Sequence, residues 1–247
     1  GCDVVMKEFC PYGFANRDLD HLTVVWSRES YKKQFFQMKD AFRQEGKILK
    51  KLSEHMKKQK VNIVRYIDSF EENETIYLVM EKVNGTDLEE VIQKGQVLPY
   101  KKTIRQIIKS VEMIHKAGIL HLDLKPSNFI VNEKGELVLI DFGSARFLDD
   151  TSKCMSFATK GYAAPELFVN EKVSRKTDSY SVGAMIYYFT TGIIPESADK
   201  RLREDGLRAI SSFVNIPDLL ERKVMKCLSL EVSERPKSLR LLYYLLL

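Results

Sequence analysis

The first part of the chain combines short apolar runs with one long amphipathic stretch. Residues 4–7 form a β-branched apolar run that predicts a buried strand. Over residues 31–55, apolar side chains recur at helical spacing, and the carboxylate of Glu45 falls on the same face. Residues 63–70 and 75–80 are two β-rich runs separated by four polar residues, which is typical of a hairpin.

From residue 84 onward the pattern becomes mostly helical. An apolar stripe over residues 104–114 predicts an amphipathic helix, and Gly118 is a natural stop for it. Two short strands are expected at residues 129–131 and 137–140, on either side of a polar turn. Further helices are predicted around residues 182–189, which form a strongly apolar and central helix, and at residues 219–228 and 238–247.

These elements predict an α+β fold with two parts. Residues 1–83 would form a small strand-rich lobe, and residues 84–247 a larger helical lobe. The chain has 247 residues, 44% of them hydrophobic, which is enough for a substantial core. We find neither a sequence repeat nor a low-complexity linker.

Composition narrows the possible functions. The net charge of +5 comes from interleaved charges, so it gives little support to a nucleic-acid partner. The four cysteines form no C-x-x-C pair, which favours reduced thiols and a cytoplasmic location. No apolar run approaches the roughly 20 residues that span a bilayer, so we expect no membrane segment. The sequence opens at Gly1 without a methionine, and we therefore expect that the true N-terminus of the protein is missing from it.

One loop gathers side chains suited to catalysis. Between a predicted helix and a predicted hairpin, residues 121–128 place Asp123, Lys125 and Asn128 close together in sequence. Asp141 follows the strand at residues 137–140 and precedes a flexible glycine. Because Mg²⁺ prefers oxygen ligands and takes few from protein when phosphates supply the rest, Asp141 and Asn128 are candidate ligands.

In these residues the sequence resembles the eukaryotic-like (Hanks-type) protein kinases. The family signatures H-x-D-x-x-x-x-N, D-F-G and A-P-E occur in order at residues 121–128, 141–143 and 164–166, and Lys7 ends a V-V-M-K that stands for V-A-I-K. Residues 7–18 also resemble the K-E-[FY]-x-P…[VN]-R-D pattern of a bacterial group of serine/threonine kinases. The resemblance implies a bilobal kinase fold, with residues 1–83 as the N-lobe and residues 84–247 as the C-lobe.

The resemblance also assigns catalytic roles. Asp123 would accept the proton of the substrate hydroxyl, and Lys125 would stabilise charge on the transferred group. ATP and Mg²⁺ would be the cofactors, and Ser or Thr hydroxyls of proteins the acceptors, because Lys125 together with Thr159 follows the serine/threonine pattern. The remaining roles are Mg²⁺ ligation by Asn128 and Asp141, and contact with the α and β phosphates by Lys7, held by an ion pair to Glu45.

The resemblance also assigns residues that contact the nucleotide base and residues that support the catalytic loop. The resemblance makes Met80 the gatekeeper and Asp87 a ribose contact. The base would meet the backbone of Glu81 and Val83 and lie between Val5 and Ile130. Structural roles would fall to His121 as a core histidine, Asp178 as an anchor of the loop backbone, and Glu166 with Arg235 as a buried ion pair.

The chain departs from the family pattern in two ways. Leu122 replaces the arginine of H-R-D, so we expect the loop over residues 142–165 to order without phosphorylation. Thr151, Ser152 and Ser156 remain candidate autophosphorylation sites, against a simpler interpretation as solvated loop residues. Only six residues precede Lys7, too few for the family's Gly-rich loop, and we therefore expect a truncated active kinase.

Two other functions stay open at this stage. One is a pseudokinase or scaffold that binds nucleotide weakly because the Gly-rich loop is missing. The other is a small-molecule phosphotransferase of the aminoglycoside type, which shares H-x-D-x-x-x-x-N and a metal aspartate. Against the latter stand Lys125 and residues 161–166, which the protein kinases use to bind polypeptides.

Overall fold

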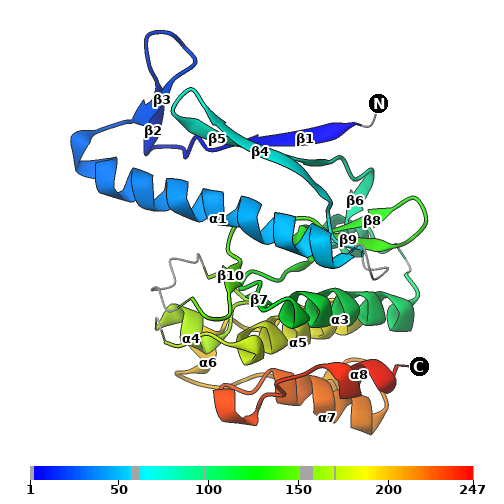
Figure 1. Ribbon diagram of the computed structural model, residues 1–247. Coiled ribbons are helices and arrows are strands. Elements are labelled where there is room, and N and C mark those ends of the chain that lie inside the picture. The colour runs from blue at the N-terminus through cyan, green and yellow to red at the C-terminus, as the bar shows by residue number, and fades with distance from the viewer. Residues whose placement is uncertain (1–2, 57–61, 97, 151–157, 170, 247) are drawn as a thin grey trace. The chain divides into compact units, whose positions relative to one another are not determined.

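A change from strands to helices near residue 84 accompanies a division of the chain into two units (Figure 1). The computed structural model describes residues 3–56, 62–96, 98–150, 158–169 and 171–246. The small unit comprises Gly1–Lys60 and Val64–Val83, and the large unit comprises Val61–Ile63 and Asn84–Leu247.

The small unit contains an antiparallel sheet of β1 (Val4–Glu8), β5 (Thr75–Glu81) and β4 (Tyr66–Glu72), in that order. The predicted hairpin over β4 and β5 is confirmed, with a tighter turn than expected. Its two central residues, Asn73 and Glu74, both have positive φ, 52° and 56°. This is the backbone geometry that matches the twist of paired strands.

The predicted burial of β1 is wrong. Val4, Val5 and Met6 are 45%, 41% and 53% exposed. Among the described residues β1 pairs with β5 alone, so it is an edge strand with one open side. We expected β4 to begin at residue 63, but Ile63 belongs to the large unit and forms an isolated bridge with Leu139 there.

The long helix of the small unit, α1 (Lys32–Met56), confirms the predicted helix. Its buried face carries Phe35, Ile48 and Leu49 and packs against β4 and β5. Glu45 lies on this face and its side chain is only 3% exposed. A carboxylate in such a position requires a charged or hydrogen-bonding partner.

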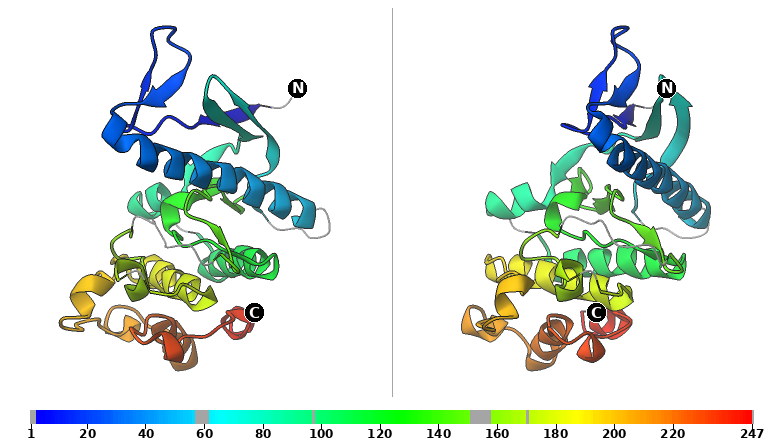
Figure 2. Two further views of the ribbon diagram at one scale, coloured as in Figure 1. Left: turned by 60° about the vertical axis from the view of Figure 1, so that its left-hand side comes forward. Right: turned by 90° about the vertical axis from the view of Figure 1, so that its left-hand side faces the viewer.

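The sequence patterns did not predict a second hairpin between β1 and α1. It consists of β2 (Ala15–Arg17) and β3 (Val24–Trp26), with Ala15 opposite Trp26. Figure 2 shows this hairpin projecting beyond the first turns of α1 within the small unit. Three residues a strand are too few for a period-two pattern to stand out.

The large unit is built around α5 (Arg175–Thr191). Its residues from Thr177 to Tyr188 are all buried, as expected for a helix surrounded by protein. It packs against α3 (Tyr100–Lys116) and α7 (Asp218–Cys227). The predicted central helix is thus confirmed.

Close packing in the large unit depends on Gly183 of α5. A Cβ atom at Gly183 would lie 2.7 Å from Cβ of Cys227 on α7, which no side chain could tolerate without a shift. The last helix, α8 (Arg240–Tyr244), is shorter than predicted. None of the helices in the described ranges is long and apolar enough to cross a membrane.

Two small sheets frame the catalytic loop. One contains β6 (Gly85–Asp87), β8 (Phe129–Asn132) and β9 (Leu137–Leu139), with β8 in the middle, and the other pairs β7 (Ile119–Leu120) with β10 (Arg146–Phe147). The predicted strands at residues 129–131 and 137–140 correspond to β8 and β9. Short helices complete the unit: α2 (Leu88–Gln93), α4 (Pro165–Phe168) and α6 (Ala198–Arg201).

Candidate active site

The catalytic loop runs from β7 to β8 in the large unit, and Asp123 is its most connected acid. Nζ of Lys125 donates to Oδ2 of Asp123 at 2.8 Å. The hydroxyl of Thr159 donates to Oδ1 at 2.6 Å. Nζ of Lys125 also lies 3.4 Å from Oγ1 of Thr159, so the three side chains close a triangle. The side chains of Asp123 and Lys125 are 16% and 26% exposed and so stay accessible.

Asn128 secures the other side of this loop. Its Nδ2 donates to the backbone oxygen of Asp123 at 2.7 Å and lies 3.5 Å from Oδ2. A 3-10 turn over Pro126–Asn128 places the amide there, and the proline fits its first position because no backbone donor is needed. Since Nδ2 is committed to Asp123, Oδ1 is the atom left to bind a cation.

Asn128 and Asp141 emerge at the same end of the β8–β9 hairpin. Phe129 pairs with Leu139 in the ladder, and the N–H of Ile140 donates to the backbone oxygen of Asn128 at 3.0 Å. Asp141 follows directly, and its Oδ1 accepts from the N–H of Gly143 at 3.3 Å. One carboxylate and one amide oxygen suit Mg²⁺ that keeps water and phosphate ligands. Within the described ranges, no three His, Cys, Asp or Glu side chains gather as a metal cage.

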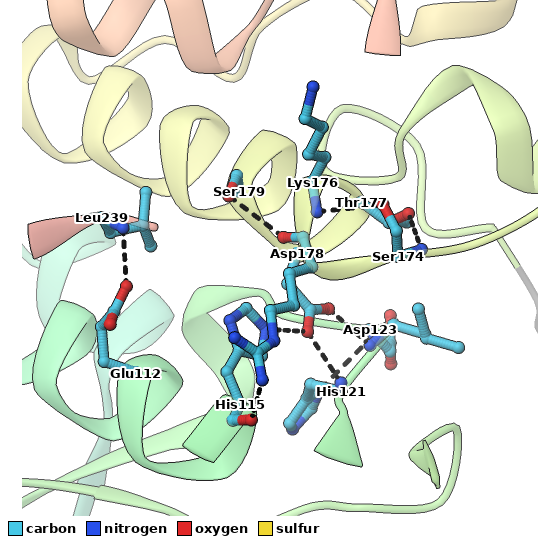
Figure 3. Close-up of polar contacts among 12 residues, drawn as sticks. Glu112, His115, His121, Asp123, Ser174, Lys176, Thr177, Asp178, Ser179 and Leu239 are labelled. Carbon is cyan, nitrogen blue, oxygen red and sulfur yellow. Dashed lines mark hydrogen bonds and ion pairs between the residues drawn. The ribbon is translucent and has the colours of Figure 1, made fainter. Parts of the chain in front are cut away.

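Asp178 near the start of α5 anchors the backbone of the catalytic loop (Figure 3). Its Oδ2 accepts from Nε2 of His115 at 2.7 Å and from the N–H of His121 at 2.9 Å. Its Oδ1 accepts from the N–H of Leu122 at 2.8 Å. Burial, the largest single effect, disfavours the charged form of Asp178. The hydrogen bonds and electrostatic attraction from His115 and His121 together outweigh burial and lower the pKa of Asp178.

Leu122 explains why such an anchor is needed. Its φ is 66°, in the left-handed region, which costs a non-glycine residue about 1–2 kcal/mol. Its side chain is 2% exposed, where the family pattern has an arginine. The bond from Leu122 to Asp178 therefore holds a strained backbone next to Asp123, and the expected anchoring role of Asp178 is confirmed.

His121 acts as a structural histidine, as expected. It is 1% exposed, and its ring centroid lies 5.1 Å from that of Phe142. Burial lowers the pKa of His121 below 6.5 despite the nearby carboxylates of Asp178, Asp123 and Asp141. The ring is therefore neutral near pH 7 and is unsuited to carry charge at the reacting centre.

We predict a pH dependence of stability from His121. The unfolded chain binds the proton of this histidine at a higher pH, near 6.5, than the folded chain does. The free energy of unfolding should thus decline as the pH falls from about 7 toward 5. In His121→Phe this decline should be shallower, whereas His55→Gln, at an exposed position of α1, should keep the native slope. Urea denaturation across this pH range measures the slope, and equal slopes for native and His121→Phe chains would refute the prediction.

The small unit contains the expected ion pair between Lys7 and Glu45. Nζ of Lys7 on β1 lies 3.0 Å from Oε1 of Glu45 on α1. Glu45 is buried and Lys7 is 35% exposed, so the lysine compensates the buried carboxylate while remaining reachable. The sequence patterns placed Glu45 on the apolar face of a helix, and the resemblance to the protein kinases named Lys7 as its partner. The structure confirms this ion pair.

The residues expected around the nucleotide base fall in both units. In the small unit, Val5 lies opposite Met80 in the β1–β5 ladder. The N–H of Glu81 donates to the backbone oxygen of Arg65 at 3.0 Å. Val83 follows β5 at the end of the small unit. Their convergence on one base stays a prediction.

In the large unit, Asp87 lies opposite Ile130 in the β6–β8 ladder. The carboxylate of Asp87 has a structural task, because its Oδ1 accepts from the N–H of Glu90 at 2.9 Å and caps α2. A ribose contact from Asp87 remains a prediction. Thr151, Ser152 and Ser156, the candidate phosphorylation sites, lie outside the described residues.

Two residues near the catalytic loop were missed or given too little weight. His115, in the last turn of α3, was not among the expected site residues, although it donates to Asp178. Thr159 was noted only as part of a substrate pattern, although its hydroxyl binds the carboxylate of Asp123. Sequence separations of 63 and 36 residues hide both contacts from any local pattern.

Comparisons with known proteins agree with this geometry. The family model described as protein kinase domain matches residues 22–241. The probable serine/threonine-protein kinase CPE1738 of Clostridium perfringens (strain 13 / Type A) is 31% identical over 180 residues, which are 68% of this chain and 26% of that protein. The smooth muscle myosin light chain kinase of Gallus gallus is 37% identical over 182 residues, 71% of this chain and 9% of that protein.

A solved structure, PpkA-294 in its apo form, superposes with a TM-score of 0.76 at 25% identity, covering 99% of this chain and 86% of that one. The expected α+β protein kinase fold is thereby confirmed, and the comparisons favour neither the scaffold nor the small-molecule phosphotransferase. The chain spans about a quarter of the Clostridium protein and under a tenth of the Gallus protein. With most of its length matched by the family model, the chain belongs to the protein kinase domain family.

Proposed function

We propose that the chain is an ATP-dependent protein serine/threonine kinase, which transfers the γ-phosphoryl group of Mg-ATP to Ser and Thr hydroxyls of proteins. One observation carries the proposal. The carboxylate of Asp123 is accessible, and Lys125 and Thr159 hold it in a fixed orientation. Phosphoryl transfer needs mainly such positioning together with charge neutralisation.

Asp123 is the residue that orients the acceptor. In the structure its Oδ1 accepts a hydrogen bond from the hydroxyl of Thr159 at 2.6 Å. An aliphatic hydroxyl is the same group that a Ser or Thr substrate presents, which supports a role for this carboxylate as hydroxyl acceptor. During the reaction Asp123 would take the proton of the attacking hydroxyl.

Lys125 places positive charge beside the acceptor. Its Nζ contacts both Asp123 and Thr159. A lysine at this point would stabilise negative charge that develops on the oxygens of the transferred group. Because Lys125 is itself held by Asp123, it needs little reorganisation when the substrate arrives.

Asn128 and Asp141 would hold Mg²⁺, and Lys7 would hold the α and β phosphates of ATP. When bound, Mg-ATP supplies the phosphoryl group and the ion neutralises part of its charge. Glu45 would keep Lys7 oriented, since the pair is already formed in the small unit. Val5, Met80, Glu81, Val83, Asp87 and Ile130 would surround the nucleoside.

The proposed partners are proteins with exposed Ser or Thr side chains. A cytoplasmic location belongs to the same proposal, because Mg-ATP is present there. Two described cysteines, Cys10 and Cys227, are free thiols. Burial raises the pKa of the Cys227 thiol to about 12, so this group is unreactive rather than catalytic.

Substitution at Asp141 tests the proposal through its metal requirement. We expect Asp141→Asn to lower phosphoryl transfer from Mg-ATP to a protein substrate by about 100-fold, because a neutral amide cannot balance the charge of the ion. The Mg²⁺ concentration needed for half-maximal transfer should rise as well. Radiolabelled ATP and a serine-rich acceptor protein give both quantities.

A matched control lies in the same segment of the chain. Asp149 is exposed, and Asp149→Asn makes the same chemical change eight residues after Asp141. It should transfer phosphate at the native rate with the native Mg²⁺ dependence. Equal losses in the two variants, or full transfer by Asp141→Asn, would contradict the proposed metal site.

A further inference from the structure

Along the chain, the β2–β3 hairpin lies between β1, which carries Lys7, and α1, which carries Glu45. We propose that this hairpin is a built-in brace, which holds α1 so that Glu45 meets Lys7 without help from a partner protein. Its consequence for catalysis rests on the proposed function, whereas the brace itself is a property of the small unit alone. Trp26, the one tryptophan of the chain, is its principal positioning residue.

β1 and Phe9, the residue that follows it, contact α1 through two neighbouring pairs of side chains. Lys7 and Phe9 are two residues apart on an extended chain, so their side chains point to the same side. Phe42 and Glu45 are three apart on a helix and share a face. The Phe9 ring lies 5.8 Å from that of Phe42, and Lys7 lies 3.0 Å from Glu45. The aromatic contact and the ion pair thus lie next to each other, and both join the β1 segment to α1. A rotation of α1 would break both contacts.

The hairpin reinforces the aromatic link. Ala15 and Val24, on its two strands, are 8% and 1% exposed and pack into one cluster with Phe9 and Phe35. Phe9 also lies 5.2 Å from Phe35 in an edge-to-face arrangement. Such aromatic pairs stabilise the packing beyond the contribution of their buried area. The hairpin therefore packs onto the residues that fix the first turns of α1.

Trp26 extends this contact along the helix. Its ring centroid lies 6.3 Å from Phe35 and 5.8 Å from Phe36. Nζ of Lys32 lies 4.5 Å from the centre of the ring, and Nε1 donates to Glu29 at 2.9 Å. All four partners belong to α1 or to the turn that precedes it. Trp26 thus fixes the start of the helix from several directions.

The same β4–β5 turn holds the hairpin and the helix. The N–H of Val24 donates to the backbone oxygen of Asn73 at 2.9 Å. From α1, the 7% exposed Lys39 donates to the backbone oxygen of Glu74 at 2.7 Å. The hairpin and the helix are therefore hydrogen-bonded to adjacent residues of one turn. An independent motion of α1 would have to break these bonds as well as the aromatic packing.

The hairpin also contains a position suited to a control substitution. Leu19, in the loop between β2 and β3, is 94% exposed. Removing its side chain changes the hairpin chemically but leaves the contacts to α1 intact. Leu19→Ala should accordingly behave as the native chain in every measurement of the brace.

The test uses NMR of the whole chain with isotope-labelled lysine side chains. Lys7→Arg identifies the Lys7 signal, and Glu45→Gln gives its position when the ion pair is lost. We expect Trp26→Ala to move the Lys7 signal toward the Glu45→Gln position, whereas Trp26→Phe and Leu19→Ala leave it in place. If Trp26→Ala does not fold, Phe36→Ala removes the 45% exposed partner ring and receives the same measurement.

Kinetics then separate a positioning role from a general loss of stability. Trp26→Ala should lower kcat for phosphoryl transfer by between about tenfold and a hundredfold. In a Glu45→Gln background the same change should have little further effect, because the ion pair is already gone. A native Lys7 signal in Trp26→Ala, or equal losses in both backgrounds, would overturn the brace. Absence of transfer by the native chain would count against the proposed function only, since the Lys7 signal is read without substrate.

Discussion

Asp123→Asn is expected to abolish most phosphoryl transfer, with a loss in kcat of about 10²–10⁴-fold. The substitution keeps the shape of the side chain, but its amide cannot accept the proton of the substrate hydroxyl. It also removes the negative charge that holds Lys125, which lies 2.8 Å away. Initial rates with a serine-rich protein substrate and saturating Mg-ATP measure the loss.

The control for this result is nucleotide binding. Asp123 belongs to the acceptor side of the proposed site, so Asp123→Asn should bind a fluorescent ATP analogue with nearly the native Kd. A large loss of nucleotide binding would mean that the variant disturbs the large unit as a whole. Native rates in Asp123→Asn would show that another group orients the hydroxyl, and the assignment of Asp123 would be wrong.

Arg235→Ala is expected to reduce the free energy of unfolding by about 3–5 kcal/mol. Its Nη1 and Nη2 lie 2.9 Å and 3.0 Å from the two oxygens of Glu166, and the guanidinium is fully buried. Nε donates to the backbone oxygen of Ser229 at 2.7 Å. Removing Arg235 leaves the charge of Glu166 buried without this partner. This uncompensated buried charge accounts for most of the expected loss of stability. Urea denaturation measures the loss.

Two further variants sharpen this prediction. Arg240 is 65% exposed and lies 3.7 Å from Glu112, so Arg240→Ala should cost less than about 0.5 kcal/mol. The double variant Glu166→Met with Arg235→Met replaces both charges by apolar groups and should be more stable than Arg235→Ala. If Arg235→Ala and Arg240→Ala cost the same, the buried pair does not stabilise the large unit as we infer.

Elements with a strong local pattern were predictable from the sequence. The helices α1, α3 and α5 each carry an apolar face or core over several turns, and the polar turn before Thr75 marked the β4–β5 hairpin. The same periodicity placed Glu45 on the buried face of α1. The spacing of apolar residues was sufficient to predict these elements, because contact with the core requires apolar side chains at that spacing.

Elements defined by their neighbours were not predictable in this way. The β2–β3 hairpin is too short to show alternation, and the loop between its strands contains no glycine. Burial of β1 was predicted from its composition alone, yet burial depends on how many strands flank it in the sheet. These features depend on contacts between two segments, and the residue pattern of a single segment carries no record of such contacts.

The candidate site shows the same division. The order of the motifs identified Asp123, Asn128 and Asp141, because the resemblance to the protein kinases rests on those residues. The bond from His115 to Asp178 and the bond from Thr159 to Asp123 required the fold. Long-range hydrogen bonds leave no periodic trace in a sequence, so the orientation of the acid could be described only with the structure.

The central claim is that this chain phosphorylates Ser and Thr side chains of proteins. The most direct measurement incubates the native chain with Mg-ATP and an acceptor protein that contains Ser, Thr and Tyr, and then identifies the phosphorylated residues by mass spectrometry. We predict phosphoserine or phosphothreonine with the native chain and none with Asp123→Asn. Phosphotyrosine alone, or transfer to a small molecule with an unmodified acceptor protein, would contradict the account.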